Sequence, residues 1–269
     1  MELGVAIGIA IGVVLAVIFV ARPGAAGGNR LLQIAIAGGA ALLAGLATTV
    51  IVERLPSAIA PRSDVDRAMD ALNEVPMFAL LLKEVPQAKD RIREAIATEQ
   101  QSPTKSGPSR PFLAIRELMR DYVAPALQHA EDASILEAAA RQARIADHLQ
   151  KTNLALCREY GLTGIQNTNR LDDEGRRLLA VALDGLAAAY RSGRQRLSVP
   201  VVLPSQQETA ELFSRGGFTP DDFSKLERFA TLDEADACAL TVKLYAAPAR
   251  LPADKGAPLA RLILLSSYR

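Results

Sequence analysis

The chain holds few side chains of the kinds that bind metals or attack substrates. Its 269 residues include two histidines, His129 and His148, and two cysteines. Neither a His-Glu-x-x-His nor a Cys-x-x-Cys spacing occurs, and those spacings are typical of zinc sites. His148 and Cys157 would lie about 13.5 Å apart along a helix, which is too far for two ligands of one zinc ion. We therefore expect no metal site and no cofactor.

The two cysteines, Cys157 and Cys238, are candidates for a disulfide bond. In an oxidising compartment they could pair, and closing so long a loop would stabilise the fold by about 4 to 5 kcal/mol. The alternative is a pair of buried free thiols. The sequence leaves both readings open, because the choice depends on the compartment.

No catalytic residue is predicted from a motif. Ser102-Pro-Thr-Lys105 has the Ser-x-x-Lys spacing of penicillin-interacting serine enzymes, and Lys105-Ser-Gly107 is similar to their second element. In those enzymes the two elements lie far apart, whereas here they share one lysine in a proline-rich loop, so we reject the match. A Gly-x-Ser-x-Gly elbow is also missing. A Ser-His-Asp or Cys-His triad assembled from distant residues stays open. Separately, an enzyme with an unrecognised site would be supported by a cleft that holds two of Arg144, Asp147, His148 and Tyr160 with perturbed pKa values.

Acidic clusters occur where helices are predicted to begin. Asp172-Asp173-Glu174, Asp221-Asp222 and Asp233-Glu234 are better explained by helix capping than by paired catalytic carboxylates. Capping boxes, in which a hydroxyl and a carboxylate bind free backbone N–H groups, are predicted at three places. They are Ser134–Glu137, Ser205–Glu208 and Thr231–Glu234, with a looser version at Ser63–Asp66.

The elements that would position these residues are nearly all helical. Apolar residues at three- and four-residue steps predict a long helix from Ile135 to Tyr160, ended by Gly161, and a second from Asp172 to Arg191. In the rest of the domain, prolines mark the boundaries of the predicted helices, because proline disfavours helical geometry in the residue before it. Helices should begin at Pro76 and Pro86, and Pro125 should kink or break a helix over 112–129.

Two further segments complete this all-α prediction. Residues 197–203 resemble a strand, but Pro200 makes them an extended connector. Residues 258–266 form a short apolar helix, too short to cross a membrane, which should dock on the bundle. We expect about eight helices and no sheet.

Two long uncharged runs precede this domain, over residues 3–21 and 31–52. As helices they would measure about 28 Å and 33 Å, which matches the hydrocarbon core of a bilayer. A short breaker-rich loop joins them, so residues 1–54 are predicted to form a transmembrane helical hairpin. Residues 55–62 then act as a linker, and residues 63–269 form a multi-helix soluble bundle.

Small residues recur at every fourth position along both predicted spans. Such faces let helix backbones approach closely in lipid. They would pack the hairpin against itself or, alternatively, drive oligomers; a pore is not expected because neither span carries a charge. These residues are Gly4, Gly8, Gly12 and Ala16 in the first span, and Ala37, Ala41, Gly45 and Thr49 in the second.

Charge distribution bears on compartment and partners. The chain has 31 basic and 30 acidic residues, so it lacks the basic excess of a nucleic-acid binder. Arg22 and Arg30 favour a cytoplasmic loop between the spans, which places the soluble domain outside the membrane; Arg54, Arg62 and Arg67 favour the opposite orientation. The preference for arginine over lysine suggests a bacterium, and we expect an inner-membrane protein with a periplasmic domain.

The function that fits these features is a membrane-anchored helical interaction module. It would act as a scaffold, adaptor or inhibitor at the bacterial envelope, with the bilayer and another protein, or a second copy, as partners. An envelope enzyme with an unrecognised site is one alternative. An oligomeric membrane element built on the small-residue faces is the other.

Overall fold

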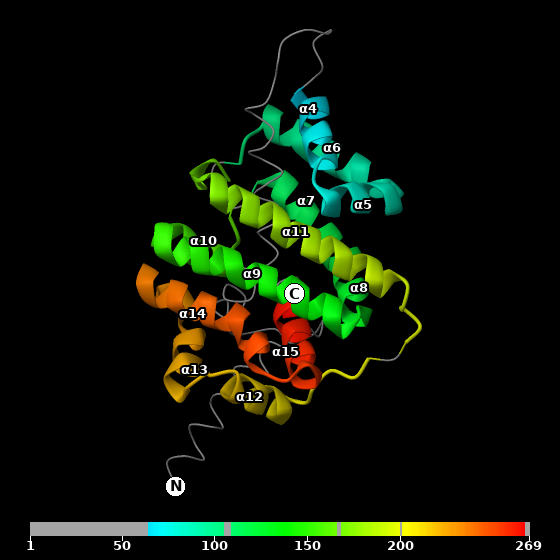
Figure 1. Ribbon diagram of the computed structural model, residues 1–269. Helices are drawn as coiled ribbons and strands as arrows, with labels where there is room; N and C mark the ends of the chain where they lie inside the picture. Colours follow the sequence, from blue (N-terminus) through cyan, green and yellow to red (C-terminus); the bar gives the residue numbers. More distant parts are fainter. Residues whose placement is uncertain (1–63, 105–108, 166–167, 200, 267–269) are drawn as a thin grey trace, which may run out of the picture.

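The computed structural model describes residues 64–104, 109–165, 168–199 and 201–266. Within these ranges the secondary structure is entirely helical, and the helices form a bundle (Figure 1). The predicted hairpin with its small-residue faces, the linker and Ser63 lie outside the described residues. None of the helices in the described ranges is both long enough and apolar enough to cross a bilayer.

Three helices, α4, α5 and α6, form one end of the bundle, at the top of Figure 1. Both α5 and α6 begin at a proline, as predicted, because the missing N–H of proline costs nothing in a first helical turn. Their apolar faces are buried through residues such as Phe78 and Ile92. Their bounds are α4 Asp64–Asn73, α5 Pro76–Glu84 and α6 Pro86–Gln101.

Pro125 interrupts the next helix, as the sequence predicts. Helix α7 (Arg110–Leu118) passes into a π-helical turn at Met119–Val123, and α8 (Ala124–His129) continues from it. Because proline has no N–H to give to the preceding turn, the hydrogen-bond ladder changes register there.

The two longest helices pack together at the centre. Helix α9 (Asp132–Thr152) lies against α11 (Asp173–Arg194), and α8 packs against the far end of α11 (Figure 1). Tyr160 and Tyr190 are the largest fully buried side chains of the core that these helices share. One continuous hydrophobic core runs from α4 to α15.

The remaining helices cover the other side of α9. Helices α10 and α14 pack on each other, and α14 and α15 both pack on α9, with α12 and α13 at the lower edge in Figure 1. Helix α15 is exposed in its first turn and mostly buried from Gly256 onward, so residues 258–266 dock on the bundle as predicted. The bounds are α10 Leu154–Leu162, α12 Gln206–Arg215, α13 Pro220–Glu227, α14 Glu234–Ala246 and α15 Ala253–Ser266.

The predicted long helix over residues 135–160 is wrong in its length. It divides at Asn153, whose backbone is extended and whose side-chain oxygen accepts the N–H of Leu156 at 2.9 Å, capping α10. Gly161 does not end the helix either, because α10 continues to Leu162. A Cβ at Gly161 would meet the hydroxyl of Thr241, so this glycine permits close packing of α10 on α14.

Two of the predicted capping boxes are wrong and one is confirmed. Helix α9 begins at Asp132, before Ser134, and Arg261 of α15 contacts that helix start. Asp233 rather than Thr231 caps α14. Ser205 and Glu208 do form the reciprocal box at the start of α12. At α9 a tertiary contact from Arg261 reaches the helix start, whereas α14 begins where the local cap of Asp233 accepts the N–H of Asp236.

The sequence analysis also predicted too few helices. The described ranges contain twelve α-helices, α4 to α15, against about eight expected. The additional helices arise because single residues such as Asn153 break one apolar periodicity into two elements. The connector expected over residues 197–203 is confirmed in part: Leu197 and Ser198 lie in a turn that follows α11, and residues 201–205 belong to no helix or strand.

Candidate functional site

Cys157 and Cys238 form a disulfide bond that joins α10 to α14. Their Cα atoms lie 5.2 Å apart, and both residues are fully buried. The same two helices also meet through Tyr160 and Tyr245, whose rings pack at a tilt of 50° with centroids 5.6 Å apart. Because the sulfurs are enclosed by core side chains, this bond holds two helices together and offers no surface to a substrate.

The four residues proposed for a distant-residue site do not gather in one cleft. His148 contacts Asp172 at 2.8 Å, and Asp147 pairs with Lys151 at 2.6 Å on the surface of α9. Tyr160 is buried and donates its hydroxyl to the side chain of Gln142. Arg144 is exposed on α9. These side chains serve separate structural contacts.

The acidic clusters cap helices. Asp172 accepts the N–H of Gly175 at 2.7 Å, and this hydrogen bond together with His148 lowers the pKa of the Asp172 carboxyl below its usual 3.8. Asp233 caps α14 in the same way, whereas at α13 the cap is Thr219, and Asp222 accepts the backbone N–H of Thr219 in a capping box. In the part of the chain that the structure describes, no three His, Cys, Asp or Glu side chains are placed to share a metal ion.

The loop with the Ser-x-x-Lys spacing is organised by a single carboxylate. Glu99 accepts the backbone N–H of Thr104 at 2.6 Å and that of Arg110 at 2.9 Å, which ties the two sides of the loop together. These hydrogen bonds lower the pKa of Glu99. Ser102 ends α6, and Lys105 lies outside the described residues.

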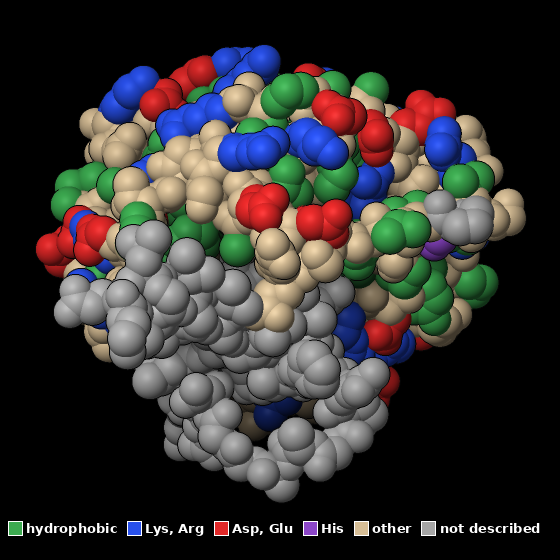
Figure 2. Space-filling model, turned by 90° about the horizontal axis from the view of Figure 1, so that it is seen from below, with side chains coloured by type: hydrophobic (Ala, Val, Ile, Leu, Met, Phe, Trp, Pro, Cys, Tyr) green, Lys and Arg blue, Asp and Glu red, His purple; other side chains and the backbone are tan. Residues whose placement is uncertain are grey.

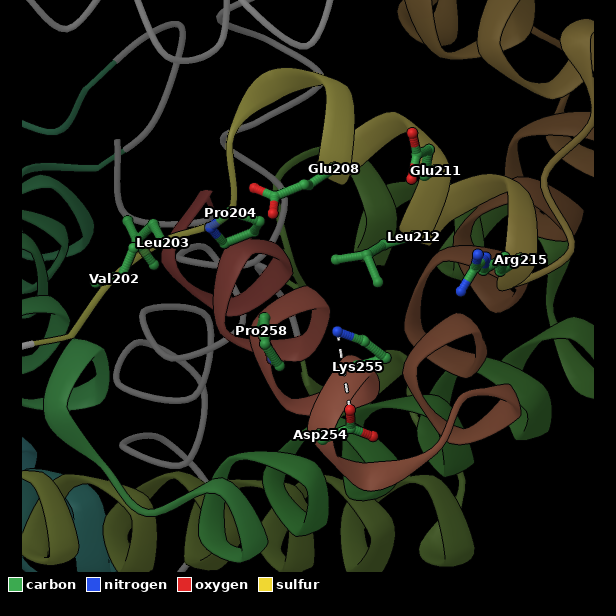
Figure 3. A pocket seen from close by; sticks show the side chains of 10 residues that line it. All are labelled: Val202, Leu203, Pro204, Glu208, Glu211, Leu212, Arg215, Asp254, Lys255 and Pro258. Carbon is green, nitrogen blue, oxygen red and sulfur yellow. Dashed lines mark ion pairs between the residues drawn. The ribbon is translucent and has the colours of Figure 1, made fainter.

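A groove between α12 and α15 is the candidate binding site. It has a volume of about 380 Å³ and opens to the surface, with α12 as one wall, α15 as the other and the connector at one end (Figure 3). Leu212 points into it from α12, and Pro258 faces it from α15. Its ten lining residues are Val202, Leu203, Pro204, Glu208, Glu211, Leu212, Arg215, Asp254, Lys255 and Pro258.

Charged side chains surround the apolar floor of this groove. At the start of α12, the carboxylate of Glu208 accepts the N–H of Ser205 at 2.7 Å. This hydrogen bond lowers the pKa of the Glu208 carboxyl, and Lys255 makes a smaller contribution in the same direction. Lys255 and Asp254 form a long ion pair of 3.8 Å. Glu211 accepts only a 3.4 Å hydrogen bond from Gln207. Three carboxylates face two cations, so the rim favours a cationic group.

Little in the sequence pointed to this groove. Its lining comes from two helices and a connector that are separated along the chain, and the charged positions look like ordinary exposed helix residues. The one available signal was the run of apolar residues over 197–203, which is unusual for a solvent-exposed connector.

The connector is the second unusual surface. Among the described residues only four large hydrophobic side chains are exposed, and three of them, Leu197, Val199 and Val202, lie here. Val202 is 89 % exposed. In Figure 2 hydrophobic side chains (green) gather along the right-hand edge, the side on which the connector runs in Figure 1. Contiguous exposed apolar side chains usually mark an interaction surface.

Comparison with known proteins returned no matching family model, no matching curated protein and no matching solved structure.

Proposed function

We propose that this chain is a membrane-anchored interaction module of the bacterial envelope, acting as a scaffold, adaptor or inhibitor. The two uncharged N-terminal runs support the anchor. A disulfide between buried cysteines supports an oxidising compartment, which for a bacterial membrane protein is the periplasm.

The groove between α12 and α15 is the observation that carries this proposal. Its volume suits one or two side chains of a bound segment rather than a large substrate. An apolar floor at Leu212 beside the carboxylate of Glu211 matches an extended segment that carries an apolar side chain next to a basic one. The occupant we propose is such a segment of another envelope protein.

Neither alternative function is favoured by an observation. For an enzyme, the described residues bring together no pair from Arg144, Asp147, His148 and Tyr160 in the groove. For an oligomeric membrane element, the small-residue faces lie outside the described residues.

Site-specific photo-crosslinking in living cells tests the proposal. A photoreactive residue at position 255, on the α15 side of the groove, should give one discrete protein adduct. The same probe at Lys151, which is exposed on α9, should give none. Adducts that are equal at both positions, or missing at both, would argue against a binding groove.

A charge variant makes the test specific for the groove. Glu211→Arg reverses the carboxylate that faces the opening, so it should abolish the adduct formed from position 255. Asp184→Arg, at an exposed carboxylate of α11, is the matched control and should leave the adduct unchanged. An adduct that survives Glu211→Arg would show that the partner does not use the groove as proposed.

A further inference from the structure

The connector between α11 and α12 exposes a stretch of main chain that makes no hydrogen bond. It runs along one side of the bundle from the end of α11 to the start of α12 (Figure 1). Residues 201–204 form no helix, strand, turn or bend. Among the described residues, no hydrogen bond reaches the main chain of these four. Their peptide groups therefore bond only to water or to a molecule that binds here.

This stretch is held in place on both sides. The Nδ1 of His129 donates a hydrogen bond of 2.8 Å to the carbonyl oxygen of Val199, which ties the connector to the end of α8. On the other side, the N–H of Ser205 donates to the carboxylate of Glu208 at 2.7 Å, which ties the connector to α12. The residues between the two ties thus cross the surface at a fixed place.

Val202 is the most prominent side chain of the stretch. It is 89 % exposed, whereas its neighbours Val201 and Leu203 are partly buried. Leu203 is followed by Pro204, and a residue before proline disfavours helical geometry, so the chain stays extended after Val202. A small aliphatic side chain therefore projects into solvent from an extended main chain.

These features match what a protease requires of a substrate. An extended peptide binds an enzyme cleft through its main-chain N–H and C=O groups, and pockets for its side chains give specificity. The pocket for the residue before the cut bond decides which sequence is cleaved, and a small apolar pocket selects small aliphatic residues. Residues inside a helix do not fit such a cleft, because their N–H and C=O groups bond within the helix.

We propose that the peptide bond between Val202 and Leu203 is a proteolytic processing site, cut by a protease with a small apolar pocket that takes Val202. One water molecule is consumed: the bond from the carbonyl carbon of Val202 to the nitrogen of Leu203 breaks, and the products are a carboxylate at Val202 and an ammonium group at Leu203. The inference goes beyond the proposed function and does not depend on what occupies the groove.

The fold tolerates a cut at this bond. No helix is interrupted, because α11 ends at Arg194 and α12 begins at Gln206. The two products also share the hydrophobic core, since α14 and α15, which follow the cut, pack on α9, which precedes it. Cleavage should therefore leave the helical content of the domain unchanged.

The disulfide bond keeps the two products joined. Cys157 lies in α10 before the cut, and Cys238 lies in α14 after it. The cut chain is therefore a two-chain protein, in which the disulfide holds residues 203–269 to the part that precedes them. Separation of the two parts needs both reduction of this bond and unfolding of the shared core.

Limited digestion of the full-length chain with pancreatic elastase tests this inference, because elastase has a small apolar specificity pocket. Among the bonds of residues 64–266, the first one cut should be that between Val202 and Leu203, identified by the mass of the fragment that begins at Leu203. In a denaturing gel the cut protein should run as one species without reductant and as two species with it.

Three variants show whether both side chain and main chain decide the cut. Val202→Asp should slow cleavage at this bond about a hundredfold, because an apolar pocket would have to accept a carboxylate. Val202→Ala keeps a small apolar side chain and should still be cut here. Leu154→Val places the same side chain at another exposed position, within α10, and should create no new cut.

A second measurement examines processing in the cells that produce the protein. Antibodies against residues 203–269 should detect, after reduction only, a fragment that begins at Leu203. The inference is overturned by a first elastase cut elsewhere in residues 64–266, by equal cleavage of Val202→Asp, or by the lack of this fragment in cells. Two fragments without reductant would overturn the role given to the disulfide.

Discussion

Cys157 and Cys238 lie within 5.2 Å of each other, Cα to Cα, although 80 residues separate them along the chain. Their bond connects α10, which follows the central helix α9, to α14, and three α-helices, α11 to α13, lie between them in the sequence. The bond therefore holds together two helices that are far apart in the sequence.

Loss of this disulfide should lower stability strongly. Cys157→Ala with Cys238→Ala removes a cross-link across a long loop, which in the chain-entropy model stabilises the fold by about 4 to 5 kcal/mol. Urea unfolding of wild-type and variant protein measures the difference. The supporting measurement is mass spectrometry after alkylation in denaturant without reductant, where no cysteine should be labelled; labelling of both would show free thiols.

The contact between His148 and Asp172 predicts a pH dependence. The folded pKa of Asp172 is lowered, chiefly by the N–H of Gly175 and then by His148. A lowered carboxyl pKa contributes stability that is present above its usual value of 3.8 and is lost as pH falls through the folded value. Asp172→Asn should therefore be less stable than wild type at neutral pH, and the two should converge in strong acid.

Thermal or urea unfolding across the pH range checks this expectation. Asp184→Asn, at an exposed carboxylate on the same helix, is the control and should differ little from wild type at any pH. A stability gap for Asp172→Asn that stays constant down to low pH would mean that the charge of Asp172 is not the cause.

Gly193 sets the approach of α11 to α8. A Cβ at this position would lie 1.7 Å from the carbonyl oxygen of Ala126, a backbone atom that cannot move aside alone. Gly193→Ala should therefore destabilise the protein by about 3 kcal/mol. Gly185→Ala on the same helix would meet the flexible side chain of Arg141 and should cost about 1 kcal/mol or less. Denaturant unfolding of both variants measures the two losses of stability. Equal losses would contradict the close approach of α11 to α8 at Gly193.

The location of the domain gives a further prediction. In intact spheroplasts, added protease should digest the helical domain of the full-length chain, while a cytoplasmic marker protein survives. The physical reason is that two arginines, Arg22 and Arg30, lie between the predicted spans, and positive charge favours a cytoplasmic loop. A domain that is degraded only after the spheroplasts are lysed would place it in the cytoplasm, and the disulfide would then need another explanation.

Much of the local structure could be predicted because it depends on neighbours in the chain. The starts at Pro76 and Pro86, the capping box of Ser205 with Glu208 and the disturbance at Pro125 all follow from backbone chemistry within a few residues. The break at Asn153 was missed although it also rests on local chemistry, the side-chain cap of α10, because the apolar periodicity continues through it.

The candidate site depends on tertiary structure even more than the helix boundaries do. The sequence by itself determined an all-helical domain, its main helix starts, an exposed connector and two uncharged N-terminal runs, because hydrophobic periodicity, capping and charge act over short distances. Only the tertiary structure decided that α12 and α15 enclose a groove and that Cys157 meets Cys238. Those relationships join residues far apart in the chain, and their geometry follows from how whole helices pack.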